Sequence, residues 1–338
     1  MKYVGIATQQ RKNNVASILL LIAFPIILLG MVWLFLAVIC YFGNTSYDAY
    51  GNVTYAYNSQ AHTSMFAESV PWVLGGVVIW FLIAYFSNTT MIRKATGAQP
   101  LERKDNPRIY NIVENLCMAC GMDMPKVNII DDRQLNAFAS GIDKNSYTVT
   151  LTTGIINRLD DDELAGVIGH ELTHIRNHDT RLLITSIIFV GIVATLTSVI
   201  VRIIENNIWF GGFNVSTDNS DRRNGGGLSA MAVLLIALVI SAIGYFFTLI
   251  TRFAISRKRE YMADAGGAEL CGNPHALASA LRKISANPGL GNVGRDDIAQ
   301  LYIIHPHSLG ATSIAAAFSQ LFSTHPSTES RIAYLEQF

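Results

Sequence analysis

Four apolar runs constrain the fold of this chain more than any other feature. They cover about residues 15–42, 70–86, 182–201 and 228–250, and each approaches the roughly 20 residues that a helix needs to cross a bilayer. Hydrophobic residues make up 50% of the chain and charged residues only 15%, a balance that soluble chains of this size rarely show. The sequence therefore predicts four transmembrane helices and the lipid bilayer as a partner.

The distribution of basic residues predicts the orientation of these helices. Lys2, Arg11 and Lys12 precede the first run, whereas residues 43–69 contain neither Lys nor Arg. Cytoplasmic loops carry the excess of basic residues in membrane proteins. We therefore expect a cytoplasmic N-terminus, with both large polar segments on the same side, and we expect the membrane to be a bacterial inner membrane.

The polar segments on either side of the second pair of runs are expected to form one cytoplasmic catalytic domain. Short strands are predicted at 126–130, 135–140 and 147–151 from β-branched content and alternation. The predicted fold class is α+β and mainly helical, with four transmembrane helices and a cytoplasmic domain that carries a small β-sheet. The expected divisions are a cytoplasmic N-terminus (1–14), a membrane hairpin (15–86), a first catalytic segment (87–181), a second hairpin (182–250) and a second catalytic segment (251–338).

Charge and cysteine content exclude some classes of protein. Lys and Arg together number 25, as do Asp and Glu, so no net basic charge favours nucleic acid as a partner. Cys117 and Cys120 form a Cys-x-x-Cys pair without a second pair to complete a metal site. We interpret them as core thiols, with half a metal site or a redox pair as the alternative.

His170-Glu171-Leu172-Thr173-His174 is the motif that carries chemistry. Asp160 and Glu163 form a capping-box pattern that predicts a helix through the motif, so that both histidines project from one face. Two imidazoles one turn apart can hold one Zn²⁺, which lowers the pKa of water to about 7, and Glu171 can take the proton. The sequence thus predicts one zinc ion per chain and peptide hydrolysis.

The third ligand is expected from a different helix, because three ligands in line on one straight helix cannot converge on a tetrahedral metal. Glu260 is the predicted ligand, and Asp264, one turn later, is predicted to accept the N–H of a ligating histidine. Glu269 is the alternative ligand, disfavoured because Gly266-Gly267 is expected to interrupt the helix before it. Asp179 is either a second outer carboxylate or a surface aspartate.

The motif helix is also expected to continue into the third apolar run. His178 is interpreted as polar surface on that helix. At a rise of 1.5 Å per residue, the metal would lie roughly 12 Å along the helix from the run. This expectation places the metal site just under the cytoplasmic surface of the membrane.

Five motifs in order resemble those of the HtpX-type membrane metalloproteases, relatives of the CAAX prenyl proteases. They are residues 91–98, residues 135–141, His170–His174 with Asp179, Arg259-Glu260 with Ala263-Asp264, and residues 324–326 with Arg331-Ile332. The resemblance implies a gluzincin fold with one zinc held by His170, His174 and Glu260, and Glu171 as the catalytic base. It also implies quality control of membrane proteins under stress, in cooperation with other quality-control proteases.

The resemblance implies two further groups of site residues. Asn136, with Ala137 and Phe138, would form an edge strand that pairs with an extended substrate. His325 and Arg331 would lie near the site and stabilise the oxyanion of the reaction. Alternatively, Asn136 only ends a turn and His325 only caps the last helix.

The predicted substrates are loops of membrane proteins or unfolded polypeptide segments. Three other functions stay open: a CAAX-type prenyl protein protease, a membrane transporter and a catalytically inactive scaffold. The chain has four apolar runs and not a larger helical chamber, which argues against a CAAX-type protease. The runs carry no ionisable residue in mid-membrane, which argues against the second. A scaffold would have lost a ligand or the base, and none is missing.

Overall fold

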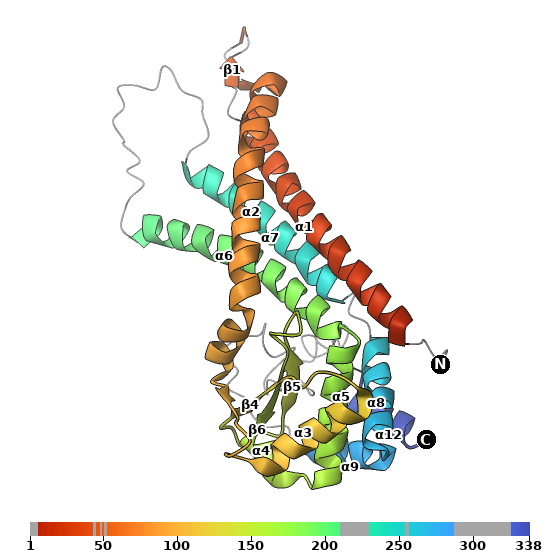
Figure 1. Ribbon diagram of the computed structural model, residues 1–338. Helices are drawn as coiled ribbons and strands as arrows, with labels where there is room; N and C mark the ends of the chain where they lie inside the picture. The colour runs from red at the N-terminus through yellow and green to blue at the C-terminus, as the bar shows by residue number, and fades with distance from the viewer. Residues whose placement is uncertain are drawn as a thin grey trace. The chain divides into compact units, whose positions relative to one another are not determined.

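The computed structural model describes residues 6–42, 45–47, 49–50, 53–209, 230–253, 257–286 and 326–338, and it is mainly helical with a small mixed sheet (Figure 1). This confirms the mainly helical part of the predicted fold class and its small sheet. Contacts between Cα atoms divide the chain into two units. The first comprises Met1–Ile18, Ala84–Ile187 and Arg252–Phe338, and the second comprises Leu19–Ile83 and Ile188–Thr251. The five predicted divisions of the chain stay a prediction.

The second unit consists of long apolar helices. They belong to α1 (Ile6–Phe42), α2 (Ser59–Thr96), α6 (Asp179–Trp209) and α7 (Ala230–Phe253), and a short hairpin of β1 (Thr45–Tyr47) and β2 (Val53–Tyr55) follows α1. Among the described residues, α1, α2 and Asp179–Glu205 of α6 are long and apolar enough to cross a membrane, whereas α7 qualifies only as the shorter helix Ala232–Tyr245. Three of the four predicted spans therefore have the required length, and the fourth stays a prediction.

The sheet of the first unit has four strands in the order β3-β4-β6-β5. They are β3 (Gln99–Pro100), β4 (Lys126–Ile130), β5 (Ala137–Ser140) and β6 (Thr148–Thr152). β4 pairs parallel with β6, and β5 pairs antiparallel with β6 at the edge of the sheet. The three predicted strands are confirmed to within two residues; the two-residue β3 has no strand pattern of its own.

Six helices described in the first unit enclose one apolar core with this sheet. They are α3 (Pro107–Cys120), α4 (Thr153–Arg158), α5 (Asp161–Arg176), α8 (Arg257–Cys271), α9 (Pro274–Ser285) and α12 (Thr328–Leu335). α5 packs against α8, α9 and β5 (Figure 1). Cys117 is buried in this core, and burial raises the pKa of its thiol to about 12, as expected for a core thiol.

The expected continuous helix from the motif into the third apolar run is wrong. α5 ends at Arg176, and α6 begins at Asp179. His178 between them has a φ of 61°, in the left-handed region that a right-handed helix cannot contain. The chain therefore turns directly after the motif, and a distance along one straight helix does not apply.

The expected interruption of the later helix at Gly266-Gly267 is also wrong. α8 runs through both glycines to Cys271, because they lie against α5. A Cβ atom on Gly267 would lie 2.7 Å from the backbone nitrogen of His170, closer than real contacts allow. Across the interface, a Cβ on Gly169 would lie 3.0 Å from the oxygen of Gly267. The glycines let the two helices approach closely enough to share a site.

Candidate metal centre

The motif helix α5 begins with a complete capping box. The Asp160 side chain accepts from the backbone N–H of Glu163 at 2.9 Å, and the Glu163 side chain accepts from the backbone N–H of Asp160 at 3.1 Å. Lys283 and Ser279 of α9 donate to the same glutamate at 2.6 and 2.7 Å. These bonds fix the start of α5, so His170 and His174 project from a helix anchored by the core on one face.

The structure brings together the three predicted ligands. One ligand atom from each of His170, His174 and Glu260 lies within 4.8 Å of the other two. The two Nε2 atoms are 3.2 Å apart, and the Glu260 carboxylate oxygens lie 3.8 Å from Nε2 of His170 and 3.6 Å from Nε2 of His174. Glu269, the alternative ligand, is exposed and does not belong to this group.

These separations fit a metal ion. Zinc binds nitrogen at about 2.0–2.1 Å, so the ligand atoms of a tetrahedral site lie about 3.3 Å from one another. The two distances to Glu260, 3.8 and 3.6 Å, are too long for hydrogen bonds but suit ligands that share one ion. Two imidazoles and a carboxylate are also the donor set of catalytic zinc sites.

The local charge points to a cation as well. Burial lowers the pKa of His174, but its hydrogen bond to Asp179 and the charges of Glu260, Asp179 and Glu171 outweigh burial and raise that pKa to about 9. The carboxylates thus create a site for positive charge between the imidazoles. A divalent ion would take the place of the proton.

Each ligating histidine has a carboxylate behind it. Nδ1 of His170 lies 3.0 Å from Oδ1 of Asp264, and Nδ1 of His174 lies 3.0 Å from Oδ2 of Asp179. Asp264 is fully buried, and Asp179 is 6% exposed. A histidine that donates Nδ1–H to a carboxylate presents Nε2 to a metal in a fixed orientation. Asp264 and Asp179 therefore stand where outer carboxylates of a metal site are expected.

Arg331 of α12 lies behind the same group. Its Nε and Nη2 donate to the two oxygens of Asp264 at 2.9 and 2.7 Å, and its Nη1 lies 3.5 Å from a Glu260 oxygen. Burial raises the pKa of Asp264, but the charge and hydrogen bonds of Arg331, with those of His170, lower it overall. This guanidinium holds the carboxylate behind His170; its predicted role at an oxyanion stays a prediction.

Glu171, the predicted base, is buried beside the edge strand. Its Oε2 accepts from the backbone N–H of Ala139 in β5 at 2.6 Å. The carboxylate is thus held against the edge of β5 opposite the β6 partner, on the strand proposed to pair with substrate. The same contact links the chemistry of α5 to the sheet.

The remaining predicted site residues lie around β5 or outside the described residues. Asn136, Ala137 and Phe138 are all buried. Asn136 lies directly before β5, where its Oδ1 accepts from the N–H of Ala137 at 3.0 Å and its backbone oxygen accepts from the N–H of Thr152 at 3.1 Å. Their role in substrate binding stays a prediction. His325 lies outside the described residues.

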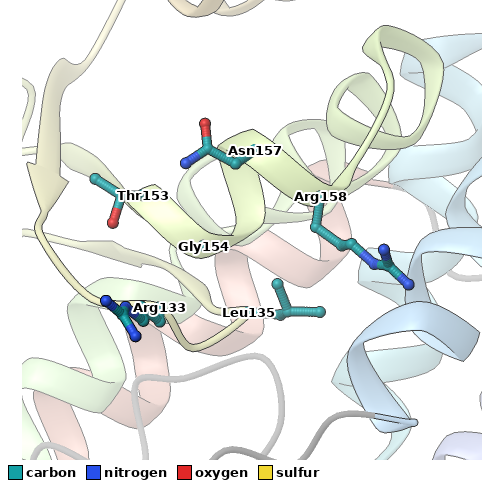
Figure 2. A pocket seen from close by; sticks show the side chains of 6 residues that line it. All are labelled: Arg133, Leu135, Thr153, Gly154, Asn157 and Arg158. Atoms are coloured by element: carbon teal, nitrogen blue, oxygen red, sulfur yellow. The ribbon is translucent and has the colours of Figure 1, made fainter.

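An open pocket of about 460 Å³ lies between α4 and the segment that precedes β5 (Figure 2). Its lining residues are Arg133, Leu135, Thr153, Gly154, Asn157 and Arg158. None of the three predicted metal ligands lines it. The pocket is therefore a separate feature of the surface.

Two imidazoles and a carboxylate around one point, with a glutamate next to the first imidazole, form the arrangement of a metallopeptidase. The model of peptidase family M48 matches residues 103–338. Two strains of Bacteroides fragilis have a protease HtpX homolog that is 54% identical over 339 residues, covering 100% of both chains. The chain therefore belongs to peptidase family M48, and within it to the HtpX-type membrane metalloproteases.

A more distant relative carries the same description, and one solved structure is similar in part. The protease HtpX homolog of Lactobacillus helveticus is 37% identical over 273 residues, which cover 79% of this chain and 87% of that one. The crystal structure of S. mikatae Ste24p has 20% identity and a TM-score of 0.47, and the match covers 81% of this chain and 60% of that one. The family match and the protease HtpX homologs confirm the resemblance found in the sequence at the level of the family.

Proposed function

We propose that this metallopeptidase is a zinc-dependent endopeptidase that cuts loops of membrane proteins and unfolded segments at the cytoplasmic side of a bacterial inner membrane. The observation that carries the proposal is the convergence of His170, His174 and Glu260, with Glu171 beside them. The ligand atoms lie 3.2–3.8 Å apart, and the carboxylates of Asp264, Asp179 and Glu171 lie around them. One zinc ion per chain is the expected occupant.

His170, His174 and Glu260 would hold the ion, while Asp264 and Asp179 would orient the two imidazoles. When bound, zinc supplies Lewis acidity and makes hydroxide available near neutral pH. Glu171 takes a proton from the attacking water. The water oxygen bonds to the carbonyl carbon of the substrate. The same carboxylate then gives this proton to the amide nitrogen as the C–N bond breaks.

The edge of β5 gives the substrate a place to lie. An extended peptide could add to this edge in either direction, and it would then pass the carboxylate of Glu171. Oε2 of Glu171 lies 2.6 Å from the backbone nitrogen of Ala139. Recognition through backbone hydrogen bonds requires an extended, unfolded segment. It depends little on which side chains that segment carries. Damaged or misfolded membrane proteins offer such segments, which supports a role in quality control under stress.

Metal analysis combined with a cleavage assay tests the proposal. Wild-type protein purified in detergent should contain one zinc ion per chain and cut an unfolded membrane-protein substrate. Glu171→Gln should keep the zinc and lose cleavage by about 10²-fold or more, whereas Glu260→Ala should lose both. Normal zinc in the Glu260 variant, or wild-type cleavage by the Glu171 variant, would refute this assignment.

The choice of substrate separates the proposal from a CAAX-type activity. An unmodified membrane protein and a prenylated C-terminal peptide are offered to the same preparation. Cleavage of the first and not the second supports the proposed substrate class. The reverse result would establish the prenyl protein protease instead.

A further inference from the structure

Polar residues at the beginning of α1 form a group of contacts that the peptidase chemistry does not use. Gln10 donates through Nε2 to the backbone oxygen of Arg176 at 2.7 Å, and Asn14 Oδ1 lies 2.9 Å from Nδ1 of His178. These residues all belong to the first unit. The head of α1 therefore rests on the turn that separates α5 from α6.

Asn13 is the central residue of this contact. Its side chain is almost fully buried, and its amide Nδ2 donates to the backbone oxygen of Asn177 at 2.7 Å and to Oδ1 of Asp179 at 2.6 Å. Both protons of the amide are used, and a flipped amide would turn its oxygen toward two acceptors. The hydrogen bonds thus fix the orientation of this side chain.

Asp179 connects Asn13 to the metal centre. Its Oδ1 accepts from Asn13, and its Oδ2 lies 3.0 Å from Nδ1 of His174. The guanidinium of Arg259 also lies near Oδ1, but its Nε is 3.7 Å away, beyond hydrogen-bond distance. The short bond from Asn13 therefore determines how the carboxylate is turned, and the carboxylate determines how the imidazole is turned.

We propose that Asn13 is a positioning residue of the metal centre and that it acts through Asp179 on His174. The inference rests on the proposed function, because it assumes that His174 holds the metal. It makes the head of the first apolar helix a part of the metal site, although Asn13 lies far before the ligand in the chain. Without the amide, the carboxylate loses the partner that holds it beside the imidazole.

The test is zinc affinity, measured on the purified full-length protein by competition with a chelator. Loss of an outer carboxylate costs about 10–100-fold in metal affinity, so Asp179→Ala should lie in that range. Asn13→Leu removes the amide and keeps a side chain of similar size. It should weaken zinc binding about 3–10-fold, less than loss of Asp179, because Asn13 acts on His174 only through that carboxylate. Gln10→Ala is the matched control, since it loosens the same head without touching Asp179, and it should stay within about twofold of the wild type.

A double-mutant cycle separates positioning from a general structural effect. If Asn13 acts through Asp179, Asn13→Leu should cause no further loss in an Asp179→Ala background. Equal losses in both backgrounds would overturn the inference. If Asn13→Leu fails to fold by circular dichroism, Asn13→Asp serves instead, because it keeps the size and places a carboxylate against Asp179.

The outcomes also distinguish this inference from the proposed function. If the wild type binds no zinc, the proposed function fails and no variant can lower the affinity. If Asp179→Ala weakens binding while both Asn13 variants match the wild type, only the role of Asn13 is refuted.

Discussion

A buried arginine at the back of the metal centre forms an ion pair with the carboxylate behind His170. Arg331 is 1% exposed and pairs through two nitrogens with Asp264, which is itself fully buried. Breaking such a pair leaves a buried charge without compensation. The pair therefore holds the Nδ1 side of His170 in place as one unit with α12.

Replacing this arginine should be costly. We expect Arg331→Met to lower the free energy of unfolding by about 3–5 kcal/mol, because Asp264 then remains buried without its counter-charge. The matched control is Arg282→Ala, which breaks an exposed pair with Glu336 and should cost less than about 1 kcal/mol. Denaturant titrations of the purified variants in detergent measure both values. Similar small losses in the two variants would contradict a structural role for the buried pair.

Local spacing explains which residues of the site could be predicted from the sequence. His170 and His174 are one helical turn apart, as are Glu260 and Asp264, so each pair shares a face wherever its helix lies. The contact of Asn13 with Asp179 joins residues far apart in the chain, and no local pattern encodes it. Its one trace in the sequence is a pair of asparagines directly before an apolar run.

At the level of elements, the close approach of α5 and α8 brings Glu260 to the histidines. The sequence alone misled here, because a glycine pair reads as a helix breaker when the neighbouring helix is unknown. In the fold, the same glycines remove two side chains from an interface that has no room for them. The turn at His178 was missed for a related reason, since the residues after the motif favour a helix on both sides of it.

Gly267→Ala should therefore weaken zinc binding without altering a ligand. The new Cβ would lie 2.7 Å from the backbone nitrogen of His170, so α8 must shift and carry Glu260 away. We expect at least about a tenfold loss of affinity in a chelator competition, comparable to loss of an outer-shell partner. Gly191→Ala in α6, where a Cβ meets nothing within 4 Å, should leave the affinity unchanged. Equal affinities in both variants would rule out the packing argument.

The start of α5 should make stability depend on pH. Burial raises the pKa of Glu163, but hydrogen bonds from Lys283, Ser279 and the backbone of Asp160, with the charge of Lys283, lower it below 4.5 overall. A lowered pKa means that the glutamate stabilises the fold fully above its unfolded-state pKa near 4.5 and loses this contribution as the pH falls through the folded-state value.

Glu163→Gln should consequently be less stable than wild type at pH 7, by about 0.5–1.5 kcal/mol, because the amide keeps the capping hydrogen bond but loses the charge that pairs with Lys283. The difference in free energy of unfolding between the two proteins should become smaller as the pH falls below about 4.5, where the wild-type carboxylate becomes protonated. Unfolding curves from pH 7 to pH 3.5 measure it, with the exposed Glu102→Gln as a control that should track the wild type. A gap that stays constant with pH would show that the charge of Glu163 does not matter.

At the scale of the whole molecule, the three long apolar helices and the family identify a membrane protein, while the side of the membrane rests on the basic residues alone. Tyr50, between α1 and α2, is 91% exposed, and the side chain of Lys144 in the first unit is 83% exposed. They are suited to report the two sides of the membrane.

The predicted orientation places these two positions on opposite sides. In intact cells, a membrane-impermeant thiol reagent should label Tyr50→Cys and should label Lys144→Cys only after the cells are opened. The four native cysteines are replaced by serine first. Labelling of Lys144→Cys in intact cells would place the catalytic residues outside the cytoplasm and overturn the proposed location.

The pairing of Arg331 with Asp264 also bears on when the enzyme can act. During translation, His170, His174 and Glu260 all leave the ribosome before Arg331, which follows Asp264 by 67 residues. A growing chain therefore has every ligand while one of its buried aspartates still lacks its counter-charge. Such a chain has the whole ligand set but lacks the buried ion pair that holds His170, so we expect the metal site to be complete only once this last segment has been synthesised.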